Sequence, residues 1–160
     1  MNAEAGESAR AALRRPAPGR FRGQQGARPM ETVLRLVALV GAVAHVYFFY
    51  KEAIQWDVSF VKRVAPSWIE EDVSDEEAKT YVARAKNLAV NMGTYNLILA
   101  IGLAWLAIVG DDVAGSLGVF LAVWLLGAAA AAAYTKVMPA FYAQGSLGVI
   151  LLIVALAARS

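Results

Sequence analysis

A histidine and a glutamate lie on one stripe of the first apolar segment, and both could carry a proton. Glu52 follows His45 by seven residues, which on a helix leaves an angular offset of about 20° and an axial separation of about 10 Å. Imidazole changes charge near neutral pH, and a partly buried carboxyl can be shifted toward that range. The separation is too long for a direct hydrogen bond, but one intervening side chain or water could connect the two groups.

The second apolar segment supplies polar residues that could meet this pair. Asn87, Asn91 and Tyr95 follow one another at four-residue intervals and so form a ridge along one helix face. Asn96 is displaced from Asn91 by about 140°, and Gln144 opens the fourth apolar segment. We expect these residues to converge on one polar patch in the outer half of the protein. The candidate ligand-binding residues are His45, Glu52, Asn91, Tyr95, Asn96 and Gln144.

Such a patch is compatible with more than one kind of chemistry. Its side chains could hydrogen-bond across helices and hold them together, each contributing roughly 0.6–2 kcal/mol. It could instead open outward and bind a polar headgroup, a quinone-like ring or a proton, with His45 and Glu52 as the titrating pair. A metal site is not expected, because the histidine–glutamate spacing and the surrounding amides are atypical of metal ligands. No nucleophile motif, P-loop or dinucleotide fingerprint occurs, so the cofactor is left unknown.

The composition indicates that much of the chain is soluble in lipid. Of the 160 residues, 59% are hydrophobic and 18% are charged, against an apolar share of about 45–50% in soluble domains. Within residues 32–50 and 88–158 the charged residues are Arg35, Asp111, Asp112 and Lys136. Cysteine is absent, which excludes disulfides and thiolate chemistry.

The elements that must position the polar residues are therefore membrane-spanning helices. About 20 residues cross the hydrocarbon layer as a helix, and the segments that meet this length are residues 32–50, 88–109, 113–134 and 140–158. The short turns between them predict an all-α, integral membrane, four-helix up-down bundle in a domain over residues 32–160. Gly102 is expected to pack against a neighbouring helix.

The region before the first span predicts the orientation of the bundle. Residues 1–31 are rich in Ala, Gly and Pro and carry six arginines, which predicts a disordered tail held in the cytoplasm. An even number of spans then places both termini in the cytoplasm and residues 51–87 outside the cell membrane. The lipid bilayer is the expected partner, and a second copy or another membrane protein is left open. No nucleic-acid partner is expected, because no aromatic residues interleave with the arginines.

The polar region over residues 51–87 is predicted to contain helical structure of its own. Ser74 and Glu77 have the spacing of a capping box, so the second long helix should begin near Asp75 and run into residues 88–109. Trp56 and Trp68 are interpreted as anchors at the membrane interface.

Two sequence patterns resemble those of a known family. His45, Tyr47, Glu52 and Trp56 resemble the H-x-Y-x4-E-x3-W pattern of the DUF1304 family, and residues 91–105 resemble its N-Q-G-x-Y-N-x2-L-A-x-G-L-x-W segment. The alanine-rich third span and the Gln144-Gly145 pair are similar to the rest of its signature. The resemblance covers residues 33–158 and implies a small four-helix integral membrane protein, with no established activity, ligand or partner.

The sequence is compatible with three functions. Our first expectation is a non-enzymatic membrane protein whose polar patch packs the helices or whose surface docks a partner. The alternatives are a binding or transport unit for a small amphiphile, quinone-like molecule or proton, and an enzyme with His45 or Glu52 as its acid–base group. Tightly packed amides would favour the first, whereas a cavity of about 300 Å³ or more would favour a ligand.

Overall fold

The computed structural model describes residues 29–69 and 72–159, and in this part of the chain the regular structure is entirely helical. The long helices are α2 (Pro29–Phe49), α4 (Asp75–Ile108), α5 (Asp111–Tyr134) and α6 (Met138–Ala157). All four are long and apolar enough to cross a membrane, which confirms the predicted fold class. The expected N-terminal tail lies outside the described residues up to residue 28, whereas residues 29–31 already form the first turn of α2.

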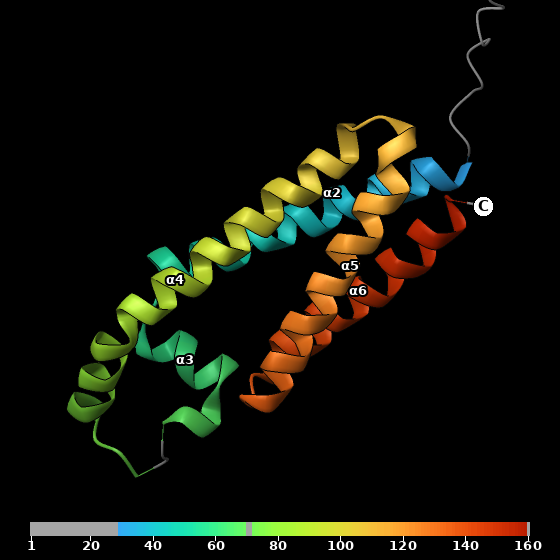
Figure 1. Ribbon diagram of the computed structural model, residues 1–160. Helices are drawn as coiled ribbons and strands as arrows, with labels where there is room; N and C mark the ends of the chain where they lie inside the picture. Colours follow the sequence, from blue (N-terminus) through green and yellow to red (C-terminus); the bar gives the residue numbers. More distant parts are fainter. Residues whose placement is uncertain (1–28, 70–71, 160) are drawn as a thin grey trace, which may run out of the picture.

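The four helices are arranged as two antiparallel pairs. α2 lies along α4, and α5 lies along α6, while α2 also contacts α6 and so joins the pairs (Figure 1). α4 and α5 meet at the turn that connects them and diverge toward the other end of the molecule (Figure 1). The start of α2 and the end of α6 share the end at which α4 and α5 meet. α4 and α5 are therefore farthest apart at the end away from the described termini.

The first span is longer than predicted because it does not stop at Tyr50. It continues through a π-helical turn, η1 (Tyr50–Ile54), and the whole apolar helix covers Pro29–Ile54. A π turn inserts an extra residue per turn and rotates the residues that follow it. Here that turn carries Glu52. The second span is likewise the inner part of α4, which begins well before residue 88.

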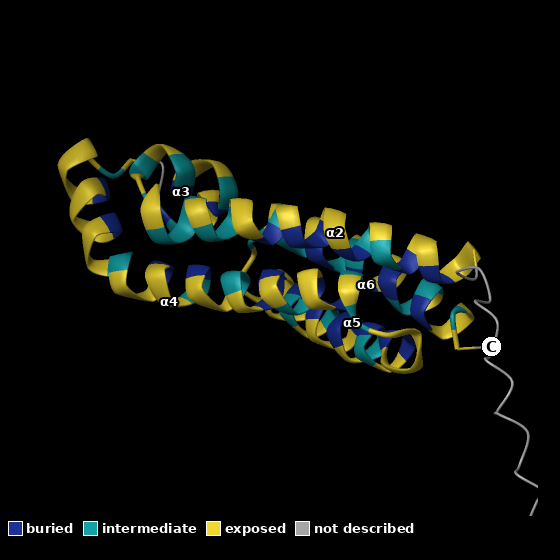
Figure 2. Cartoon of the chain, turned by 90° about the horizontal axis from the view of Figure 1, so that it is seen from above, coloured by how far each residue is buried: buried dark blue, intermediate teal, exposed yellow. Residues whose placement is uncertain are grey.

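Buried leucines and small residues hold the pairs together. The central core contains Leu34, Leu103, Leu106, Leu125 and Leu151, all fully buried. A Cβ atom at Gly102 would lie 3.1 Å from Leu121 Cδ2 of α5, so the predicted packing of Gly102 against a neighbouring helix is confirmed. The buried positions face the interior of the bundle and the exposed ones face outward (Figure 2). Outward apolar side chains such as Val40 and Val43 suit contact with lipid.

An arginine connects the helices at the end of the bundle near the described termini. Arg35 of α2 donates hydrogen bonds to the carbonyl oxygens of Ala107 at 2.8 Å and Val109 at 2.7 Å. It also forms a 2.6 Å ion pair with Asp111 at the start of α5. Because the last carbonyls of a helix lack partners within it, Arg35 both caps α4 and joins three helices.

A small helical cap covers the opposite end. It consists of α3 (Val58–Val64) and the 3-10 turn η2 (Pro66–Trp68). Asp57 is the N-cap of α3, where its carboxylate accepts a 2.8 Å hydrogen bond from the backbone nitrogen of Phe60. The predicted capping box is also confirmed, since Ser74 and Glu77 exchange the expected bonds and α4 begins at Asp75. A separate buried cluster formed by Val61, Ile69, Ala78 and Val82 attaches this cap to α4.

Candidate functional site

The candidate site begins where α4 approaches the π turn at the end of the first span. A Cβ atom at Gly93 would lie 2.9 Å from Ala53 Cβ, 3.0 Å from the Ala53 nitrogen and 3.2 Å from the Phe49 carbonyl oxygen. Only a residue without a side chain allows this backbone approach. Lys86, two helical turns earlier, donates a 2.9 Å hydrogen bond to the Ala53 carbonyl oxygen. The turn that carries Glu52 is therefore held on both sides by α4.

This close approach brings Glu52 into contact with Asn96. The Asn96 amide nitrogen donates a 2.7 Å hydrogen bond to Glu52 Oε2, and both residues are partly buried. Because Asn96 belongs to α4, the hydrogen bond directs the Glu52 carboxyl group toward α4. The carboxyl group faces two neighbouring cavities.

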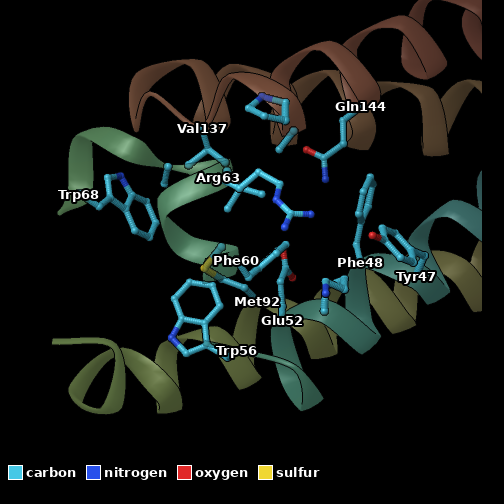
Figure 3. A pocket seen from close by; sticks show the side chains of 15 residues that line it. Tyr47, Phe48, Glu52, Trp56, Phe60, Arg63, Trp68, Met92, Val137 and Gln144 are labelled. Atoms are coloured by element: carbon cyan, nitrogen blue, oxygen red, sulfur yellow. The ribbon is translucent and has the colours of Figure 1, made fainter. Parts of the chain in front are cut away.

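The first of these, which we name the covered cavity, lies between the helical cap and the ends of α2 and α6. It has a volume of about 200 Å³. Phe48, Trp56, Phe60 and Trp68 contribute aromatic walls, and Lys51, Glu52 and Arg63 contribute charges. The Arg63 side chain extends from α3 toward the space between Glu52 and Gln144 (Figure 3).

The second, which we name the lateral cavity, lies between α4 and α5 and has a volume of about 640 Å³. Leu88, Leu99, Ala128 and other apolar residues form most of its walls. Tyr95 and Trp124 also line it, and they are 54% and 46% exposed, so its mouth opens on the side of the bundle. That side is where membrane-spanning helices meet lipid.

The two cavities meet at a polar neck. The residues that line both are Glu52, Trp68, Met92, Val137, Ala140 and Gln144. Gln144 is 8% exposed and projects into this region from α6 (Figure 3). Glu52 and Gln144 are thus polar groups from different helices at the junction between an apolar chamber and a charged one.

Indole groups fasten the cap above the neck. Trp68 Nε1 donates a 3.0 Å hydrogen bond to the carbonyl oxygen of Thr135 at the end of α5. Trp56 Nε1 donates a 3.1 Å hydrogen bond to the carbonyl oxygen of Val82 in α4. Beyond the interfacial role predicted for them from sequence, Trp68 ties the cap to the end of α5, and Trp56 ties the segment just before α3 to α4.

The structure brings together four of the six residues proposed from sequence. Glu52, Tyr95, Asn96 and Gln144 line the lateral cavity, whereas Asn91 is exposed and lines neither cavity. The reason is helical geometry: Asn91 and Asn96 differ by about 140° around α4 and cannot face the same space. The expectation that Asn91 joins the patch is therefore corrected.

His45 is separated from the cavities by its position deeper in the bundle. It is fully buried, and its Nδ1 lies 2.8 Å from the Gly41 carbonyl oxygen, to which it must donate. Its ring packs edge-on against Phe48 at a centroid distance of 5.4 Å. Its Nε2 has no hydrogen-bond partner among the described residues. His45 lines neither cavity, so it backs the wall formed by Phe48 and does not contact their contents.

Several residues of the site were missed from sequence. Arg63, Phe60 and Lys51 line the covered cavity, and Lys51 also lies 5.2 Å from the centre of the Phe60 ring. A local sequence pattern could have identified two of them. Asp57 precedes a short segment in which Phe60 and Arg63 are three residues apart and share a helix face. Hydrogen bonds from Phe60 and Ser59 hold the pKa of Asp57 below its usual range.

Comparison with known proteins assigns the chain to a family. The DUF1304 profile, described as a protein of unknown function, matches residues 39–156. The chain belongs to the DUF1304 family. The DUF1304 match extends from within α2 to within α6 and includes Glu52, Asn96 and Gln144. The resemblance noted from sequence is confirmed, and this DUF1304 protein is a four-helix membrane protein. No curated protein and no solved structure matches the chain.

Proposed function

We propose that this DUF1304 protein binds one amphiphilic molecule from the membrane. The hydrocarbon chain of the ligand would occupy the lateral cavity, and its polar end would lie at the neck beside Glu52 and Gln144. The observation that carries the proposal is the lateral cavity itself, whose volume of about 640 Å³ exceeds the roughly 300 Å³ at which ligand pockets begin. This volume favours the binding alternative over a bundle in which the polar residues only pack the helices.

The distribution of polarity supports the same ligand. A pocket for an amphiphile needs long apolar walls and a few convergent polar groups at one end. The lateral cavity has Leu88, Leu99 and Ala128 along its walls and Glu52, Asn96 and Gln144 toward the cap. Its mouth lies on the side of the bundle, so a lipid-soluble molecule can enter without leaving the membrane. The proposal includes no chemical reaction.

We also propose that both termini are cytoplasmic and that the cavities lie at the outer face of the cell membrane. Six arginines precede the first span, and positive residues are retained on the cytoplasmic side. Single cysteines introduced at Ser8 and Ser74 test this orientation with an impermeant thiol reagent on intact cells. We expect labelling at Ser74 and protection at Ser8, and the reverse pattern would overturn the proposed orientation.

A brominated monoacylglycerol tests the binding proposal. Bromine quenches tryptophan fluorescence on contact, and Trp56 and Trp68 line the cavities. Replacing Trp105 and Trp124 with phenylalanine leaves these two as reporters. We expect saturable quenching in nanodiscs, and we expect Ala128→Phe to abolish the saturable part because Ala128 lines the lateral cavity.

Ala130→Phe is the matched control. Ala130 lies on the same helix, is exposed and lines neither cavity, so the same added volume there should leave quenching unchanged. Non-saturable quenching that is equal in the Ala128 and Ala130 variants would show general contact with lipid and would refute a bound amphiphile.

A further inference from the structure

Building on the proposed binding of an amphiphile, we infer that the polar end of the ligand is an anion and that Arg63 binds it. The ligand class is then a single-chain amphiphile with a carboxylate or phosphate head. Two observations support this: the position of Arg63, whose donors have no partner among the described residues, and the excess of basic residues around the covered cavity.

Arg63 is an exposed cation at the wall of a cavity, and it has no partner within the part of the chain that the structure describes. It lines the covered cavity, and its guanidinium projects toward the space beside Glu52 and Gln144 (Figure 3). Among the described residues it makes no hydrogen bond and no ion pair within 4.0 Å. By contrast, Arg35 binds two carbonyl groups and an aspartate, and Lys86 binds a carbonyl group. The donors of Arg63 are therefore available to a ligand.

Glu52 does not act as the anionic partner of Arg63. Its carboxyl group accepts a 2.7 Å hydrogen bond from Asn96, and it does not pair with Arg63 although both face the covered cavity. The ionisable residues lining this cavity are Lys51, Glu52 and Arg63, so the basic residues outnumber the acidic one. An anionic head lowers this excess of basic groups, whereas a cationic head would increase it.

The geometry of the donors indicates which anion is bound. A guanidinium presents a planar fork of N–H groups that matches the two oxygens of a carboxylate or phosphate. Gln144, buried at the neck, adds an amide that can donate to the same oxygens. With the head between Arg63 and Gln144, the hydrocarbon chain can pass through the neck into the lateral cavity, because Gln144 lines both spaces.

The test compares ligands that share one brominated acyl chain. Brominated stearate, its methyl ester and the corresponding amine are titrated against the Trp56/Trp68 reporter protein in nanodiscs at alkaline pH, where the stearate is ionised. A brominated alkyl phosphate distinguishes the two anion sources, and tight binding of either anion supports the inference. We expect the preferred anion to bind at least about 10-fold more tightly than the ester, because a charge-assisted bidentate contact is present only with the anion.

Variants on α3 identify the residue responsible. Arg63→Ala should weaken anion binding at least about 10-fold and leave binding of the ester unchanged, and Arg63→Lys should restore part of the loss. Lys62→Ala removes the same charge from the neighbouring position, where the side chain pairs with Asp75 at 3.9 Å. That control should retain the affinity of the parent for the anion.

The outcomes separate the two proposals. If the ester and the anions bind equally well and saturably, the amphiphile site stands and the inference about its head is overturned. Equal losses in the Lys62 and Arg63 variants would also overturn it, because the effect would then come from general surface charge. If none of the probes binds in a manner sensitive to Ala128→Phe, the proposed function itself fails.

Discussion

The Asn96 amide donates a 2.7 Å hydrogen bond to the carboxyl group of Glu52 and so joins α4 to the π turn that ends the first span. The two residues are 44 positions apart in the chain, and both line the lateral cavity. The same contact therefore stabilises the pairing of the helices and orients a polar group toward the space in which we propose a ligand binds.

Removing the Asn96 donor should destabilise the protein more than replacing the Glu52 acceptor with glutamine. Asn96→Leu leaves the partly buried carboxyl without its partner and should lower the free energy of unfolding by about 1–3 kcal/mol. Glu52→Gln keeps an oxygen that can accept the same bond and should cost less than about 1 kcal/mol. Unfolding of the detergent-solubilised protein measures both. The exposed Asn91→Leu variant is the control and should differ from the parent by no more than about 0.5 kcal/mol.

Gly93 should tolerate no side chain. A methyl group there would lie 2.9 Å from Ala53 Cβ and 3.0 Å from the Ala53 nitrogen, so Gly93→Ala should destabilise the protein by about 1–3 kcal/mol. Gly127→Ala is the matched control, because a Cβ atom at Gly127 meets nothing within 4 Å. There the better helix propensity of alanine should leave stability unchanged or raise it by up to about 1 kcal/mol. Equal effects of the two substitutions would show that the close approach at Gly93 is unimportant.

Lys136 should be replaceable by glycine with a gain in stability. It has a φ of 61° in the turn between α5 and α6, and the Lys136 and Val137 nitrogens donate to the carbonyl oxygens of Ala133 and Ala132. This arrangement ends many helices and favours glycine at the left-handed position. Lys136→Gly should raise the free energy of unfolding by about 0.5–1 kcal/mol. Lys136→Ala, which removes the charge and keeps the strain, should give no gain.

The helical cap should loosen in acid. Hydrogen bonds from the backbone nitrogen of Phe60 and from Ser59 lower the pKa of Asp57, and those from Ser74 lower the pKa of Glu77. A depressed folded-state pKa stabilises the cap above the ordinary carboxyl pKa of about 4, and this contribution is lost as the pH falls through the folded-state value. Fluorescence of Trp56, which packs against Phe60, should report the change below about pH 4.

Asparagine at position 57 separates titration from capping. It caps helices about as well as aspartate but does not titrate, so Asp57→Asn should preserve the neutral-pH fluorescence and weaken its acid dependence. An acid transition of unchanged size in this variant would assign the effect to other carboxyl groups.

The elements of the fold that sequence predicted are those encoded within short stretches of chain. Lipid solubility is a property of each segment, so hydropathy and length located the four spans, and the Ser74–Glu77 capping box located the start of α4 because its bonds join residues three apart. The π turn at Tyr50–Ile54 was not predicted, since it packs against Gly93, which is far away in sequence.

The site was harder to predict because cavities arise between elements. Helical periodicity could place Asn96 and Asn91 on different faces, but only the position of α2 and α5 around α4 shows which face is inside. Arg63 has an ordinary sequence context, and its place beside the covered cavity depends on the way Trp68 fastens the cap over the neck. Contacts between residues so far apart in the chain cannot be predicted from hydropathy or residue spacing.

The three bonds of Arg35 give the bundle a pivot at one end. They fasten the end of α4 to α2 and α5, whereas α4 and α5 diverge toward the other end (Figure 1). Met92, a wall of both cavities, lies sixteen residues before Ile108 and therefore on a lever arm of about 24 Å. Gly93 and Asn96 hold α4 on the first span, so α2 and α4 would tilt together against α5. A tilt of that pair by about 5° at the pivot would move the Met92 wall by about 2 Å and change the width of the cavity mouth, while every helix stays intact.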